Sequence, residues 1–152
     1  MSERIPFRTN IRETVGAFMV NFGAELALTN PGYKLQYYPG RPASIFPPTA
    51  FVNRFRERLE GKGSYHRQRR PQCEVVVLHG LFDSAEAAAQ SDRFVDGLLE
   101  YVETFSHAAG PNSLLEIVLI DDDPSFVADW LAPERVRLYY ATKITFEGFV
   151  MD

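Results

Sequence analysis

Residues 73–106, CEVVVLHGLFDSAEAAAQSDRFVDGLLEYVETFS, contain the pattern that decides the fold. Glu74–Leu78 is a short apolar run rich in valine, which indicates a buried strand. His79-Gly80 is expected to break this strand. Asp83 stands three residues before Glu86, the spacing of a capping box at the start of a helix. A strand therefore leads through a turn into a helix, which has to lie on a sheet.

Two amphipathic helices are expected. The helix after Asp83 should be about six turns long. An earlier helix should run from an Asn10 cap to the stop signal Asn30-Pro31-Gly32, because the residues after Asn10 have helical spacing of apolar side chains. The side chains that we predict to be buried against the sheet are Val15, Phe18 and Phe22 of the earlier helix and Phe94, Leu98, Val102 and Phe105 of the later one.

The remaining stretches predict short strands and loops. Residues 50–59, AFVNRFRERL, fit either a helix or an exposed strand, and local pattern leaves this open. The other expected elements are a strand at Tyr33–Tyr38, an extended surface arm over PGRPASIFPP (39–48), a basic loop at 61–71, a turn at Ala108–Asn112, a buried strand at Leu114–Ile120, a loop and helical turn capped by Asp123, and one long alternating strand over Arg135–Val150.

This order of elements predicts an α+β protein. We expect a single domain over residues 1–152. Its sheet should be mixed or antiparallel, with two main helices packed on one face. An extended Pro-rich arm and a long β-hairpin loop should occupy about 39–72. The 45% hydrophobic content and the lack of a long apolar run predict a globular protein without a membrane segment. Cys73, the one cysteine, reads as a core residue, which suits assembly in a reducing cytoplasm.

Positive charge is concentrated in one part of the chain. Residues 41–70 hold eight of the 16 Lys and Arg residues but only Glu57 and Glu60 as acids, although the whole chain has a net charge of −4. Such asymmetry often marks a surface that meets a charged partner. Contact with phosphates is one alternative for this segment, and a solvated loop is another. No recognisable nucleic-acid module surrounds it, so sequence-specific nucleic-acid binding is not expected.

Candidate chemical sites are few. VVVLHGLFDS is similar to the strand and HG turn of α/β-hydrolases, but the chain has no G-x-S-x-G nucleophile motif, so a truncated hydrolase-like enzyme is only an alternative. Asp121, Asp122 and Asp123 could offer oxygen ligands, yet neighbouring residues on an extended segment point in alternate directions. We therefore expect no catalytic residue, no metal and no cofactor.

The order of elements resembles the tail terminator proteins of long-tailed bacteriophages, the family of the lambda tail terminator. The corresponding features are the helix from Ile11, Gly40-Arg41-Pro42 in the arm, AFVNRFRERL paired with CEVVVLHG, the helix from Ser84, and the closing RVRLYYATKITFEGFVMD. The resemblance favours a strand for residues 50–59. It also implies a structural virion protein rather than an enzyme.

The resemblance implies a hexameric ring at the head-proximal end of the tail, assembled in the host cytoplasm. Such a ring stops polymerisation of the major tail tube protein and offers a surface to the head–tail connector, and the genome would pass through its lumen. Another neck or head-completion protein is the alternative. The residues that we expect at interfaces with partners are Arg41, Arg54, Arg56, Arg58, Lys62, Arg67, Arg69, Arg70, Arg137, Tyr139 and Lys143.

Overall fold

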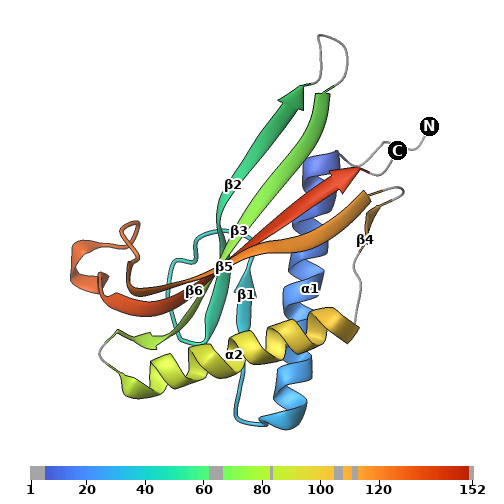
Figure 1. The fold of residues 1–152 in the computed structure, drawn as a ribbon. Coiled ribbons are helices and arrows are strands. Elements are labelled where there is room, and N and C mark those ends of the chain that lie inside the picture. Colours follow the sequence, from blue (N-terminus) through green and yellow to red (C-terminus); the bar gives the residue numbers. More distant parts are fainter. Residues whose placement is uncertain (1–5, 62–66, 83, 105–107, 111–112, 151–152) are drawn as a thin grey trace.

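The computed structural model describes residues 6–61, 67–82, 84–104, 108–110 and 113–150 (Figure 1). These ranges form α1 (Phe7–Thr29), β1 (Gln36–Tyr38), β2 (Thr49–Gly61), β3 (Arg67–Leu81), α2 (Ala85–Thr104), β4 (Ala108–Gly110), β5 (Ser113–Val127), the short 3-10 helix η1 (Pro133–Arg135) and β6 (Leu138–Val150). The strands build one sheet in the order β1-β2-β3-β6-β5-β4. Among the described strands, only β1 and β2 pair in parallel, so the sheet is mixed and the predicted α+β class is confirmed.

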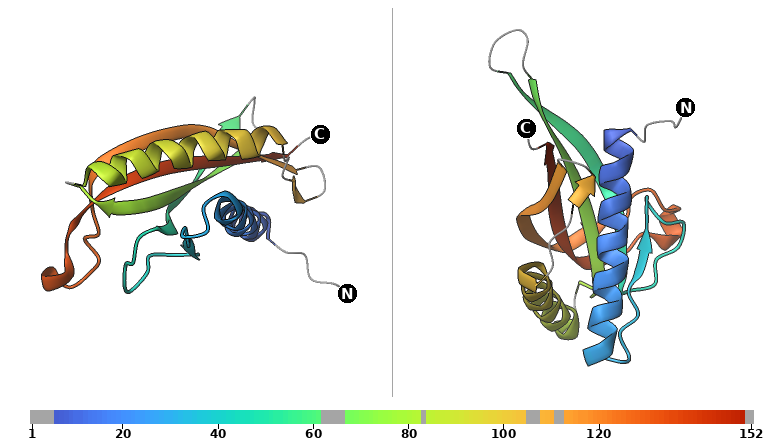
Figure 2. Two further views of the ribbon diagram at one scale, coloured as in Figure 1. Left: turned by 90° about the horizontal axis from the view of Figure 1, so that it is seen from below. Right: turned by 90° about the vertical axis from the view of Figure 1, so that its right-hand side faces the viewer.

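Both helices pack on one face of the sheet, which we call the helix face (Figure 2). α2 packs over β3 and β6, and α1 packs against β1, β3 and β4. The main core fills the space between helices and strands, and the ring of Phe18 stands edge-on to that of Phe146, with centroids 5.3 Å apart. The predicted burial is confirmed for Val15, Phe18, Phe22, Phe94 and Leu98. It is wrong for Val102, which is 37% exposed, and Phe105 lies outside the described residues.

The opposite face of the sheet, the far face, has a second and smaller core. It consists of Phe51, Val76, Leu78, Phe126, Ala128, Tyr139 and Ala141. Residues 39–48 contain no helix or strand, and together with the connection between β5 and β6 they cover this core. The Trp130 indole N–H donates a 2.8 Å hydrogen bond to the carbonyl of Pro42, which ties the two segments together.

The central hairpin is longer than the sequence suggested. Residues 50–59 form strand, as the resemblance favoured, and pair antiparallel with β3. Arg67–Pro71 also belongs to β3, which corrects the prediction of a loop over 61–71, and residues 62–66 lie outside the described part. The expected break at His79-Gly80 is wrong as well. β3 continues to Leu81, because a bulge between Leu78 and Gly80 absorbs the irregularity.

The C-terminal strands also depart from expectation. Asp121–Asp123 lies within β5 rather than in a loop, and a bulge between Asp123 and Phe126 accommodates Pro124 without a helical turn. β6 begins at Leu138, not at Arg135, and lies in the centre of the sheet between β3 and β5. The predicted turn over Ala108–Asn112 contains the short strand β4.

The two expected helix caps have different outcomes. α1 begins at Phe7, so Asn10 lies inside the helix and is not its cap. For α2, Asp83 lies outside the described residues, and the Ser84 hydroxyl accepts a hydrogen bond from the Ala87 backbone N–H.

Candidate assembly surface

Two strand edges are open over most of their length. β1 pairs only with Thr49–Phe51 of β2, and β4 pairs only with Ser113 and Leu114 of β5. Within the described ranges, the outer side of β2 from Val52 and that of β5 from Leu115 therefore form no ladder. A long open edge is a template for pairing with another chain, so charge on such an edge decides what can pair there.

A bulge at Asn53 sets the direction of the arginines on β2. Val52 pairs with Val75, but Arg54 pairs with Glu74, so Asn53 is an extra residue. After it, Arg54, Arg56 and Arg58 point from the far face, and all three are exposed. Arg58 stands opposite Arg70 of β3, an arrangement of like charges that disfavours folding. Arg70 lies 3.1 Å from Glu147, which offsets part of this repulsion.

On the helix face the same side of the molecule is also basic. The guanidinium groups of Arg8 and Arg12 lie 4.6 Å and 4.4 Å from the ring centroid of Phe55, as cation–π contacts. Arg69 forms a bidentate ion pair with Glu57, and this hydrogen bond holds the pKa of Glu57 below its ordinary value. The basic flank is defined as Arg8, Arg12, Arg54, Arg56, Arg58, Arg69 and Arg70.

The β5 side of the molecule is acidic. The acidic flank is defined as Asp92 and Asp96 of α2 with Glu116, Asp121 and Asp122 of β5, all of them exposed. Val118 and Leu119, which lie on this edge, are 43% and 57% exposed. Between α2 and β5 runs a groove of about 650 Å³, lined by Asp92, Val95, Asp96, Leu99, Ile120 and Asp122. The sheet therefore separates a basic side from an acidic side.

The predicted interface residues do not form one surface. Arg54, Arg56, Arg58, Arg69 and Arg70 come together in the basic flank. The remaining ones have other places. Tyr139 is buried in the far-face core, which corrects its assignment to an interface. Lys143 forms an ion pair with Asp123 at 3.3 Å, and Arg137 is exposed near η1. Arg41 lies over the Trp130 ring and donates a hydrogen bond to Asn53. Lys62 and the side chain of Arg67 lie outside the described part.

Sequence reasoning missed the acidic flank as a unit. Its members come from α2 and β5, which only the tertiary structure brings together. The run Asp121–Asp123 was a signal, since alternation along a strand sends Asp121 and Asp122 to opposite faces. Reading the run as a loop concealed this.

His79, the residue behind the hydrolase alternative, belongs to a buried network. Its Nε2 lies 2.8 Å from the Thr142 hydroxyl, which lies 2.7 Å from the Ser91 hydroxyl, and Ser91 donates to Asp122. Burial lowers the pKa of His79 to about 4, with Asp122 opposing the shift. Ser91 and Thr142 are fully buried, so these hydroxyls cannot reach a substrate in this conformation. The network joins α2 to β3, β5 and β6.

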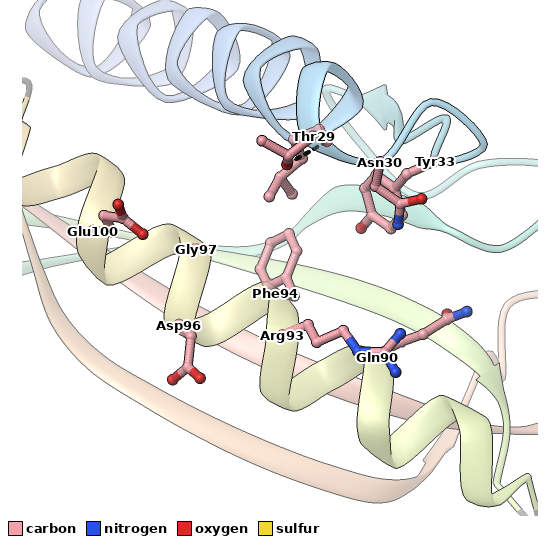
Figure 3. A pocket seen from close by; sticks show the side chains of 10 residues that line it. Thr29, Asn30, Tyr33, Gln90, Arg93, Phe94, Asp96, Gly97 and Glu100 are labelled. Atoms are coloured by element: carbon pink, nitrogen blue, oxygen red, sulfur yellow. Dashed lines mark hydrogen bonds between the residues drawn. The ribbon is translucent and has the colours of Figure 1, made fainter.

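A second pocket, of about 560 Å³, lies between the end of α1 and α2 (Figure 3). Phe94 points towards α1 at its base, while Arg93 and Glu100 supply opposite charges from α2. Asp96 points away from α1, towards the β5 side. The Tyr33 hydroxyl is buried and forms no hydrogen bond within the described ranges. With mixed charge at its walls, this pocket favours no single class of charged ligand.

The described residues hold no group of three or more His, Cys, Asp or Glu side chains that could bind a metal ion. No helix in this part of the chain is both long enough and apolar enough to cross a membrane. Compared with known proteins, the chain matches no protein-family model and no curated protein.

Proposed function

We propose that this chain is a structural assembly protein that associates head to tail into a ring, as a phage tail terminator does. One observation carries the proposal: the basic flank and the acidic flank lie on opposite sides of one sheet, each beside an open strand edge. A surface that complements the other side of the same molecule forms heterologous contacts. Such contacts close into a ring when the rotation between copies allows it.

In a phage tail, this ring would cap the head-proximal end of the tube, stop its growth and present a face to the head connector. The β2–β3 hairpin supports this role, because it projects beyond the other strands (Figure 1), and its outer part includes the exposed Arg58. Charge on a projecting hairpin can reach a tube end or a neighbouring subunit. Six copies are the number that the family resemblance implies.

The test is the size of the particle in solution. We expect native mass spectrometry and negative-stain images to show closed rings with six times the mass of the chain. Rising salt should dissociate them, because exposed charges are screened. Arg54→Glu with Arg56→Glu should abolish the rings, whereas the matched pair Lys34→Glu and Arg135→Glu, exposed outside the basic flank, should not. A compact monomer at every concentration, both alone and with tube protein, would refute the proposal.

A further inference from the structure

The groove between α2 and β5 has the features of a protein-binding site rather than of a solvated surface. Its apolar part consists of Val95, Leu99 and Ile120, and Leu99 is 47% exposed. Asp92 and Asp96 rise from α2 on its rim, and Asp122 closes it from β5. An occupant of this groove should therefore present an apolar or aromatic group flanked by positive charge.

The other side of the same molecule presents such a group. Phe55 is half-buried on β2 and points from the helix face, with the guanidinium groups of Arg8 and Arg12 over its ring. We propose that the groove of one copy receives the Phe55, Arg8 and Arg12 cluster of a second copy. This inference rests on the proposed ring and specifies its contact on the helix face.

Strand direction permits this contact. β2 is antiparallel to β3, β3 to β6, and β6 to β5, so β2 and β5 run in opposite directions. If a second copy continues the sheet without turning over, its β2 meets β5 as an antiparallel neighbour. An antiparallel pair is the arrangement that the rest of this sheet already uses, apart from β1.

The register within the sheet fixes how the two copies must be offset. Phe55 of β2 is paired with Cys73 of β3, and Cys73 is paired with Phe146 of β6. Ile120 of β5 is paired with Ile144 of β6, so Phe55 and Ile120 lie at positions of β6 that are two residues apart. An offset of two positions along β6 therefore brings Phe55 beside Ile120. Because side chains alternate with a period of two, an even offset keeps each side chain on its own face.

The same offset matches charges on the far face. Through Glu74 of β3, Arg54 is level with Thr145 of β6. A shift of two positions brings Arg54 to the level of Lys143, which is paired with Asp121 of β5. Before the shift, Arg56 is level with Glu147 of β6 and so with Glu116 of β5. Arg58 lies two positions beyond Arg56, so the same shift of two positions brings Arg58 to the level of Glu116. One offset thus pairs Phe55 with Ile120, Arg54 with Asp121 and Arg58 with Glu116. The agreement of both faces on one offset is the strongest support for the contact.

Charge reversal tests the helix-face contact directly. Arg8→Asp with Arg12→Asp, and separately Asp92→Arg with Asp96→Arg, should each weaken association at least about tenfold in sedimentation experiments. Mixing the two variants in equal amounts should restore assembly, because each reversed surface then has a complementary partner. The matched controls Lys34→Asp with Arg135→Asp, and Asp129→Arg with Glu134→Arg, reverse exposed charges outside both flanks and should leave association unchanged.

A cross-link gives a readout that does not depend on affinity. Arg12→Cys combined with Asp96→Cys should give disulfide-linked oligomers under mild oxidation, since Cys73 is buried. If wild-type rings form but the reversals leave them intact and no cross-link appears, the groove contact is wrong while the ring stands. If the wild type forms no ring, the proposed function fails. Loss of assembly without rescue on mixing would show that the two reversed surfaces do not contact each other, which also overturns the contact between copies.

Discussion

Leu98 and Leu99 are neighbours on α2, but their surroundings differ in a way that predicts a large difference in stability. Leu98 is fully buried in the main core, whereas Leu99 is 47% exposed beside the groove. Leu98→Ala removes buried methyl groups and leaves a cavity, which costs roughly 2–5 kcal/mol. Leu99→Ala loses only part of its contact area, so it should cost about 1 kcal/mol or less.

The pair is a matched experiment, because the substitution and the helix are the same. We would measure the urea midpoint and the slope of unfolding for both variants at a concentration where the wild type is dissociated. For a chain of this size, the Leu98 variant should also melt roughly 4–20 °C lower than the wild type. Equal losses for the two variants, or a loss below about 0.5 kcal/mol for Leu98→Ala, would show that the assigned buried face of α2 is wrong. The groove contact adds a second expectation: Leu99→Ala should weaken assembly while leaving the fold stable.

Three further predictions concern single buried sites. The folded pKa of His79 is about 4, below the ordinary 6.5, so the unfolded chain takes up the proton first as pH falls. The contribution of this site to stability should therefore be present above pH 6.5 and disappear towards pH 4, and the His79→Gln variant should show a shallower loss of stability over that range. Burial raises the pKa of the Cys73 thiol to about 12, so a thiol reagent should modify Cys73 in denaturant but hardly at all in the native protein. Gly148→Ala should destabilise the protein although alanine suits strands no worse than glycine, because its Cβ would collide with Ile11 of α1, and the companion change Ile11→Val should restore part of the loss.

The helices were predictable because their signal is local. The apolar residues of α1 recur at helical spacing, and Asn30-Pro31-Gly32 stops the helix where the structure ends it. The buried face of α2 was predicted only in part. Ala87 and Ser91 complete it, because small side chains let the helix approach the sheet near Gly80 and Thr142. Hydrophobicity alone gives no weight to such residues, and it favoured Val102 instead.

The errors in the strands have a common cause. His79-Gly80 and Pro124 are strong local break signals, yet both lie at or beside bulges inside long strands. Whether a strand ends or bulges depends on its neighbours across the sheet, which local pattern cannot reveal. The part of the basic flank on β2 and β3 was predictable, since its charges are close in sequence, but Arg8 and Arg12 join it only because α1 packs beside Phe55. The acidic flank was not, because Asp96 and Asp122 meet only when α2 lies beside β5.

The bulge at Asn53 means that the faces of the later β2 residues depend on whether the number of residues in the strand is even or odd. If β2 passed Asn53 with regular alternation, Arg54, Arg56 and Arg58 would turn towards the helix face and Phe55 would turn away from Arg8 and Arg12. Deleting Asn53 itself would remove the bulge and leave these side chains on their present faces. Insertions or deletions of two residues in the outer part of the strand would preserve the faces. Variation in the length of this hairpin should therefore be tolerated in even steps, and an odd step should survive only where a bulge is gained or lost with it.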